Sequence, residues 1–190
     1  MGTWSDKDFE EKMTIHIDNI YKGIFKDKLV SIFRSEREKN QDKRLLFMDI
    51  ELSIDTHLTF KNGSILTFQE KSRRNQYMKF NDFTFEYYND PKKKLEGEWF
   101  KLASQLYFYG YSDAQESKYL KYWIINVARL RTGLLSMFTI EEMEQKFMRY
   151  NEKHGKASFF GIPFRILESI PNVVVFKHPS NKQISIPITP

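Results

Sequence analysis

Cysteine is absent from this 190-residue sequence, and its absence excludes several kinds of site. Without thiolates the chain can hold no cysteine-ligated zinc, no iron–sulfur cluster and no cysteine nucleophile. Disulfide bonds are excluded too, so the fold must be stabilised by the burial of apolar side chains. Hydrophobic residues make up 41% of the chain and aromatic residues 16%, which indicates an ordered, compact fold rather than disorder.

Long apolar runs and common cofactor motifs are also missing. The segment Met1–Asp8 is charged where a signal peptide needs an apolar core, and no later run approaches the ~20 apolar residues that span a bilayer. No Gly-x-x-x-x-Gly-Lys or Gly-x-Ser-x-Gly motif occurs, and no two histidines have zinc-ligand spacing. We therefore expect a cytoplasmic protein with no membrane partner and no small-molecule organic cofactor.

Charge of one sign is not in large excess. Lysine and arginine number 30 and aspartate and glutamate 25, so the net charge of +5 is compatible with a polyanionic partner without requiring one. No internal repeat, low-complexity tract or linker divides the chain. We interpret residues 1–190 as one domain with a core at about residues 5–130. Residues 131–190 then form a C-terminal extension of helix and strand that completes the fold or contributes to specificity or oligomerisation.

The start of the chain predicts an amphipathic helix. Apolar residues recur at helical spacing from Phe9 through Met13 to Ile24. Ser5 precedes this run as a helix cap. The charged stretch Arg34–Arg44 has no apolar period, which predicts a solvated loop or helix end.

Two β-type runs follow, Ile54–Phe60 and Ile65–Lys71, with Asn62-Gly63 between them. An Asn-Gly pair between such runs is the strongest short-range signal for a β-hairpin.

Later segments predict further strands and helices. They are a third strand at Phe83–Tyr88, a helical or mixed region at Gly97–Tyr109, a buried strand at Tyr119–Val127, a helix from Ile140 to His154 ended by Gly155, and edge strands at Phe159–Leu167 and Val173–Lys177. Together these elements predict a mixed α+β (α/β) fold with a central mixed sheet flanked by helices.

The hairpin brings three polar side chains to one face of the expected sheet. Side chains alternate along a strand, so Gln69 and Lys71 share one face while Phe68 and Glu70 share the other. Because Phe68 belongs to the core, Glu70 is expected to emerge at the strand end. Asp55 lies on the partner strand, so a carboxylate, an amide oxygen and an ammonium group converge. Such a cluster favours phosphodiester hydrolysis, since Mg²⁺ prefers oxygen ligands with few carboxylates and a lysine can orient the attacking water.

At these residues the chain resembles the PD-(D/E)XK nuclease superfamily, whose motif is an acidic residue on one strand and acid-x-lysine on the next. The matching segments are Ile54-Asp55-Thr56 and Phe68-Gln69-Glu70-Lys71, within a similar order of elements over roughly residues 5–130. Asp55 matches the acid and Lys71 the lysine. Gln69 stands where most members carry Asp or Glu, although some members, including certain homing endonucleases, use Gln-x-Lys.

The resemblance implies a restriction-endonuclease-like core and Mg²⁺-dependent hydrolysis, with Mn²⁺ able to substitute. Asp55 and Gln69 then bind the metal, Lys71 acts on the attacking water, and the first helix contributes a further acid. We assign that acid to Glu10, because a helical wheel puts it near the apolar stripe and puts Asp18 toward solvent. The alternative for Glu10 is an exposed carboxylate near the helix start, where the helix dipole favours negative charge.

Four further side chains near the motif have two interpretations each. Glu86 projects either toward the site or toward solvent. Asp49 and Glu51 can serve the site or can only cap and form ion pairs. His57 shares the face of the motif's acid and can assist proton transfer, or it can have a surface role.

Basic residues beside the motif are candidates for DNA contacts. Arg73 and Arg74 follow directly after the motif lysine, and Lys92, Lys93 and Lys94 form a run in a predicted loop. Lysine and arginine contact phosphates and position a duplex without reading its sequence. The lysine run can equally serve solubility.

We therefore predict a metal-dependent DNA endonuclease that hydrolyses phosphodiester bonds by water attack and, as the resemblance implies, leaves 5′-phosphate ends. Because a duplex has two strands, we expect a homodimer or a higher symmetric oligomer. The alternative is a noncatalytic nucleic-acid-binding or assembly module in which Gln69 marks a lost active site. A third possibility is an α/β interaction protein without affinity for DNA.

Overall fold

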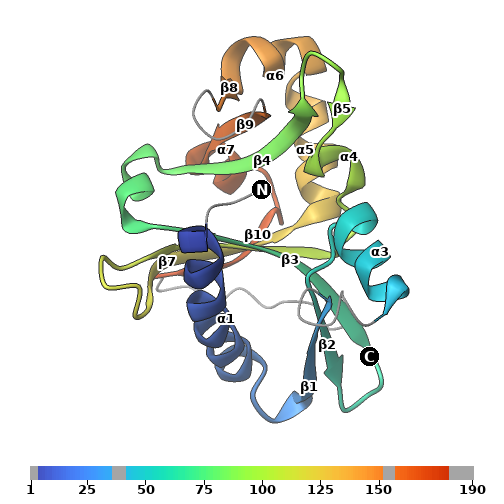
Figure 1. The fold of residues 1–190 in the computed structure, drawn as a ribbon, viewed down its shortest axis with the longest axis vertical. Helices are drawn as coiled ribbons and strands as arrows, with labels where there is room; N and C mark the ends of the chain where they lie inside the picture. The colour runs from blue at the N-terminus through green and yellow to red at the C-terminus, as the bar shows by residue number, and fades with distance from the viewer. Residues whose placement is uncertain (1–3, 36–41, 152–156, 180–190) are drawn as a thin grey trace.

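The computed structural model describes residues 4–35, 42–151 and 157–179, with side chains from residue 8 onward. Two β-sheets form its centre, and the helix α1 (Trp4–Phe25) covers the face of the larger sheet that the smaller sheet does not cover (Figure 1). The prediction of a mixed α+β fold with a central mixed sheet flanked by helices is confirmed. The expected cap at Ser5 lies outside the described side chains, and Gly155 lies outside the described residues.

The larger sheet has six strands. Their order is β1 (Leu29–Arg34), β2 (Thr56–Phe60), β3 (Ile65–Arg73), β6 (Leu106–Ser112), β7 (Tyr119–Asn126) and β10 (Val174–His178). Neighbouring strands are antiparallel except β3 and β6, which run parallel. β7 and β10 confirm the strands predicted near the same residues, and β10 forms one edge of the sheet.

The predicted hairpin is confirmed as β2 and β3. Thr56 pairs with Phe68 and Thr59 with Ile65. In the turn, Gly63 has a φ of 81°, a left-handed conformation that glycine adopts without steric cost.

The third predicted strand is present, but it belongs to a different sheet. β4 (Asp82–Asp90) pairs with β5 (Leu95–Glu96) on one side and with β9 (Ser158–Pro163) on the other, and β8 (Met148–Tyr150) completes the smaller sheet. The expectation of an edge strand at Phe159–Leu167 was wrong, because β9 is an interior strand and its continuation Phe164–Ser169 forms the helix α7. The sheet to which β4 belongs and the interior position of β9 both depend on the pairing of these two strands. They lie about 75 residues apart, and local sequence patterns do not specify such a pairing.

The remaining helices connect the strands. They are α3 (Lys43–Leu52), α4 (Glu98–Lys101), α5 (Val127–Met137) and α6 (Ile140–Phe147), with the 3₁₀ turns η1 (Lys26–Lys28) and η2 (Asn75–Phe80). The mixed region predicted at Gly97–Tyr109 resolves into α4 and the start of β6. The helix predicted for Ile140–His154 is shorter than expected, because the residues after Phe147 pair with β9 as β8.

The two faces of the larger sheet have separate cores. On one face, Met13, Ile17 and Tyr21 of α1 pack against Phe68 and Phe108. On the other face, Tyr107, Tyr109, Tyr111 and Trp123 of β6 and β7 pack against the smaller sheet and against α5, α6 and α7. Because successive side chains of a strand point to opposite faces, β3 contributes to both sides of this arrangement.

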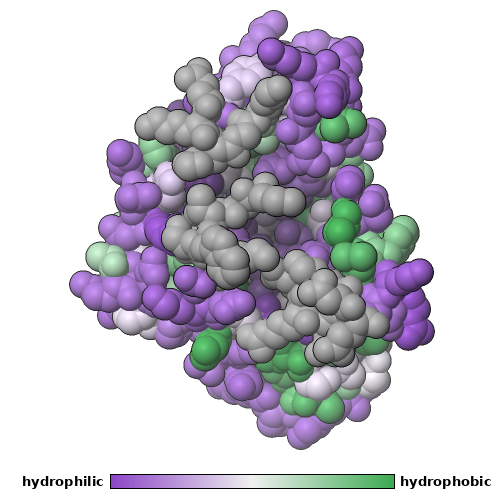
Figure 2. All heavy atoms as spheres, in the orientation of Figure 1, coloured by the Kyte–Doolittle hydropathy of each residue, from purple (hydrophilic) through white to green (hydrophobic). Residues whose placement is uncertain are grey.

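The helix α3 lies at the flank of the molecule and buries none of its side chains. Leu46, Phe47 and Ile50 are 37%, 55% and 48% exposed. Figure 2 shows hydrophobic residues on the flank that carries α3 in Figure 1. None of the helices in the described ranges combines the length and the apolar character needed to cross a bilayer.

The substitution Gly110→Ala is expected to destabilise the protein by about 1–3 kcal/mol, because it overpacks a filled core. A Cβ on Gly110 would lie 2.5 Å from Cδ1 of Tyr119, a ring that is only 6% exposed. The matched control is Gly23→Ala, where a Cβ meets nothing within 4 Å and alanine should stabilise helix α1 by about 0.5–1 kcal/mol. Urea unfolding of both variants tests the pair, and equal stability of Gly110→Ala and the wild type would contradict the packing argument.

Candidate functional site

A cavity of about 490 Å³ opens where β3 extends beyond the start of β2. Asp55, Gln69, Lys71 and Glu10 all line it, so the structure brings together the four residues that the sequence predicts for the site. Glu86, one of the ambiguous residues, lines the same cavity. These residues come from α1, from the segment before β2, from β3 and from β4, and they are up to 76 positions apart in the sequence.

The position of Asp55 follows from the way β2 ends its pairing with β3. The main-chain N–H of Asp55 donates to the carbonyl of Phe68 at 2.9 Å, and beyond this point the pairing with β2 stops. The next free donor on β3, the N–H of Glu70, donates instead to Oδ2 of Asp55 at 2.7 Å. The carboxylate therefore replaces a strand partner, which fixes it beside the two motif residues of β3.

Gln69 and Lys71 point toward the face of β3 that carries the smaller sheet. In the parallel pairing with β6, Gln69 lies beside Tyr107 and Lys71 beside Tyr109. Oε1 of Gln69 is buried and has no hydrogen-bond partner among the described residues. Lys71 likewise makes no ion pair within the described ranges. A ligand in the cavity can therefore use both side chains without displacing an existing contact.

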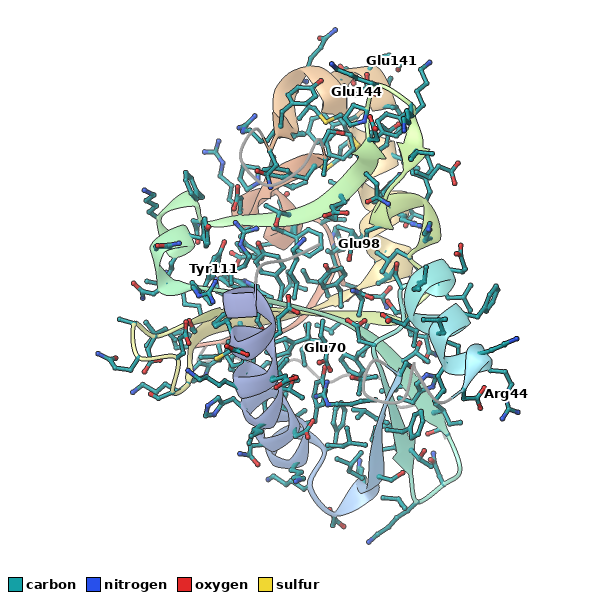
Figure 3. All side chains as sticks on the ribbon, viewed as in Figure 1. Arg44, Glu70, Glu98, Tyr111, Glu141 and Glu144 are labelled. Carbon is teal, nitrogen blue, oxygen red and sulfur yellow. The ribbon has the colours of Figure 1, made fainter. Side chains whose placement is uncertain are left out.

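Glu70 lies on the opposite face and does not emerge into solvent, contrary to expectation. Its side chain is 8% exposed and accepts hydrogen bonds from Arg34 Nη1 at 2.5 Å and from the hydroxyl of Tyr21 at 3.0 Å. Figure 3 shows Glu70 close to α1, beneath β3. A buried carboxylate needs such partners, because an unpaired charge in the core is very costly.

Arg34 and Asp18 were also expected to face solvent, and the structure places both against the interior of the protein. Arg34 was expected in a solvated stretch, but its side chain is 8% exposed and also binds Oδ1 of Asp18 at 2.5 Å. Asp18 was expected to face solvent, yet it lies at the inner side of α1 with Arg34. Burial lowers the pKa of Arg34, but Glu70 and Asp18 more than offset this and raise it above its ordinary value, so Arg34 remains charged. This network joins α1, β1 and β3 at the wall of the cavity, which Arg34 and Glu70 also line.

Other sequence candidates divide between the cavity and its surroundings. Glu10 is exposed and lines the cavity. Thr14 and Ile17, one and two helical turns further along α1, line it as well. Asp49 lines the cavity as well, whereas Glu51 forms an ion pair of 3.6 Å with Lys101.

His57 lies outside the cavity. Its ring is 6.0 Å from that of Phe33 on β1, and burial lowers its pKa below the usual value. The structure therefore gives no geometric support for its proton-transfer role.

Two of the predicted DNA contacts are engaged within the protein. Arg73 donates to Oγ1 of Thr84 at 2.8 Å, and Arg74 donates to Glu116 at 2.9 Å while its guanidinium lies over the ring of Phe9. The lysine run at residues 92–94 is exposed in the turn between β4 and β5.

Glu98 is a cavity residue that the sequence did not single out as a site residue. It is the first residue of α4, and its Oε1 accepts a hydrogen bond of 2.6 Å from the hydroxyl of Tyr107. No local pattern identifies it, because the contact depends on how β4, α4 and β6 pack.

The oxygen atoms of Asp55 and Gln69 suit Mg²⁺, even though the described side chains alone do not complete the coordination of a metal ion. In the part of the chain that the structure describes, no three histidine, aspartate or glutamate side chains are grouped closely enough to hold a metal ion. Mg²⁺ needs only one or two protein carboxylates, because it retains several waters. Asp55 supplies one carboxylate, and the buried, unpaired Oε1 of Gln69 is a neutral oxygen ligand beside it.

Stability is expected to fall as the pH rises above about 10, where tyrosine ionises. Burial is the main cause that raises the pKa of four tyrosines above the ordinary 10.0: Tyr21, Tyr107, Tyr111 and Tyr119. A raised folded-state pKa stabilises the protein fully below pH 10, and this contribution is lost as the pH rises toward the folded-state value. Urea unfolding between pH 8 and 11.5 measures the slope. Tyr107→Phe should reduce the slope, whereas a flat profile of the wild type would contradict the argument.

No protein-family model matches the chain, and no curated protein matches it significantly.

Proposed function

We propose that this protein is a metal-dependent DNA endonuclease of the PD-(D/E)XK type. The observation that carries the proposal is the convergence of Asp55, Gln69, Lys71 and Glu10 on one cavity from three separate parts of the chain. A short motif arises easily by chance, but chance alone does not direct all its side chains into a common cavity.

The order of elements supports the same proposal. A helix is followed by the antiparallel strands β1, β2 and β3, and then by β6 parallel to β3. The resemblance implies a core of this kind, a mixed sheet with the acid at one strand and the lysine on the next. The second sheet is an addition that covers the Gln69 face and forms one wall of the cavity.

The chemistry of the cavity explains why a cation is needed. Six acidic and three basic side chains line it, so an anionic phosphodiester would meet an excess of negative charge. In the proposed complex, Asp55, Gln69 and Glu10 hold Mg²⁺ or Mn²⁺. When bound, the cation supplies Lewis-acid stabilisation of the charge on the phosphate oxygens.

The residues of the chain orient the reactants. The N–H of Glu70 keeps Asp55 turned toward the cavity. The ammonium group of Lys71 donates hydrogen bonds to the attacking water and to a phosphate oxygen, which orients the water and stabilises negative charge in the transition state. The exposed lysines at residues 92–94 are the better placed of the predicted contacts for the DNA backbone, since Arg73 and Arg74 have internal partners. Cleavage of both strands would require two such sites, hence a homodimer or higher oligomer.

One observation favours a second candidate function. Gln69 is neutral where a charged ligand is usual, which favours a noncatalytic nucleic-acid-binding or assembly module that kept the cavity. Such a module would bind DNA with a strong dependence on salt but would not cut it.

A cleavage panel tests the proposal. Supercoiled plasmid, linear duplex, single strand and four-way junction are incubated with Mg²⁺, Mn²⁺ or EDTA, using the wild type, Lys71→Met and the matched exposed control Lys22→Met. We expect cutting that requires metal, falls at least ~100-fold in Lys71→Met and is unchanged in Lys22→Met. Salt-dependent binding without cutting of any substrate would favour the noncatalytic module, and no DNA affinity at any salt concentration would overturn both.

A further inference from the structure

Glu98 is held against β4 by a close approach of two backbones. A Cβ on the preceding residue, Gly97, would lie 2.9 Å from the carbonyl oxygen of Tyr87 and 3.0 Å from backbone atoms of Glu86, so only glycine fits without a shift. The N–H of Gly97 donates to that same carbonyl of Tyr87 at 2.9 Å. The start of α4 is therefore fixed, and the side chain of Glu98 leaves it toward the cavity rather than toward solvent.

Tyr107 then fixes the carboxylate itself. The tyrosine is fully buried, and its hydroxyl donates to Oε1 of Glu98 at 2.6 Å. The other oxygen, Oε2, has only a long contact of 3.4 Å with the N–H of Glu86. Glu98 therefore keeps one oxygen with unused capacity to bind a ligand.

The same tyrosine lies beside the motif residues. Tyr107 is the direct neighbour of Gln69 in the parallel pairing of β3 and β6, and the two side chains share a face. Figure 3 shows Glu98 on the opposite side of β3 from Glu70, between the two sheets. Asp55, Gln69, Glu98 and Tyr107 thus line one cavity.

We infer that Glu98, positioned by Tyr107, is a further cation ligand of this site. It supplies a carboxylate beside Asp55 on the face of β3 to which Gln69 points, whereas Glu10 comes from α1 on the other face. The inference rests on the proposed function, which provides the cation. Two carboxylates and one amide oxygen, completed by water, form a ligand set that Mg²⁺ and Mn²⁺ accept. Glu86 is the less suitable carboxylate, because its side chain makes no hydrogen bond with the described residues that would hold it in place.

Direct binding of Mn²⁺ tests this role without relying on activity. The free Mn²⁺ signal in electron paramagnetic resonance is titrated with the wild type, Glu98→Gln, Tyr107→Phe and the control Glu96→Gln, an exposed carboxylate two residues away on β5. We expect Glu98→Gln to weaken Mn²⁺ binding about 100-fold and Tyr107→Phe about 10-fold, the range known for groups that bind or orient metal ligands. Glu96→Gln should bind as the wild type does.

The folding of the variants can be controlled independently. In Glu98→Gln the amide oxygen can still accept from Tyr107, so urea unfolding should change little while Mn²⁺ affinity falls; this separates a ligand from a structural residue. Glu98→Asp provides a second variant, which keeps the charge but withdraws it by one methylene and should bind with intermediate affinity.

Two negative results have different meanings. Wild-type Mn²⁺ affinity in Glu98→Gln together with loss of binding in Asp55→Asn would overturn the role of Glu98 and leave the proposed function standing. Absence of Mn²⁺ binding by the wild type, with and without a DNA duplex, would overturn both.

Discussion

Replacing Asp55 with asparagine is expected to lower metal-dependent DNA cleavage by at least about 1,000-fold with little loss of stability. The physical reason is that Asp55 has two separable roles. Its Oδ2 accepts a hydrogen bond from the N–H of Glu70, and an asparagine Oδ1 can accept the same bond. The negative charge that would hold the cation has no such substitute, so the chemistry should fail while the fold remains.

Asp55→Ala provides the contrast. It removes both the charge and the acceptor, and it leaves the Glu70 N–H without its partner at the end of the β2 pairing. We therefore expect the same loss of cleavage, together with a decrease of about 1–3 kcal/mol in the free energy of unfolding. Single-turnover cleavage and urea unfolding measure the two effects, with Asp27→Asn, an exposed carboxylate in η1, as the control. Cleavage by Asp55→Asn within about tenfold of the wild-type rate would remove Asp55 from the proposed metal site.

The parts of this site that the sequence could predict are those determined by local patterns. Asn62-Gly63 between two β-type runs specifies the hairpin and its register, and the register determines which side chains share a face. Gln69 and Lys71 follow from this directly, because they are two positions apart on one strand. Asp55 follows from the same hairpin, since it directly precedes the paired residues of β2.

The parts that the sequence could not predict depend on packing between distant segments. The strand at Phe83–Tyr88 alternates aromatic residues in the same way whether it joins the central sheet or, as observed, pairs with β9 in a second sheet. The role proposed for Glu98 depends on that second sheet. Arg34 precedes a run of charged residues, so its local context indicates solvent, while its burial becomes apparent only when β1 pairs with β2 and α1 lies across them.

Replacing Arg34 with methionine is expected to destabilise the protein by about 3–5 kcal/mol, the cost of leaving a buried charge without its partner. Methionine fills a similar volume, but Glu70, at 8% exposure, would keep only the hydroxyl of Tyr21 as a side-chain donor. The control is Arg44→Met. Arg44 forms an ion pair with Asp42 at an exposed position, its side chain 87% accessible, and Figure 3 shows it directed away from the body of the protein. Urea unfolding should show little change there, because exposed ion pairs contribute little.

The double variant Arg34→Met with Glu70→Gln tests whether the cost arises from an unpaired charge. Glutamine removes the charge but still accepts from Tyr21, so the double variant should be more stable than Arg34→Met alone, despite carrying one more substitution. Additive destabilisation would instead mean that Arg34 stabilises the fold through packing.

The charge explanation also has a consequence for the site. Glu70 lies between Gln69 and Lys71, and its N–H holds Asp55, so an uncompensated charge on Glu70 would disturb the strand that carries the motif. In the double variant, restored stability should therefore be accompanied by restored Mn²⁺ affinity.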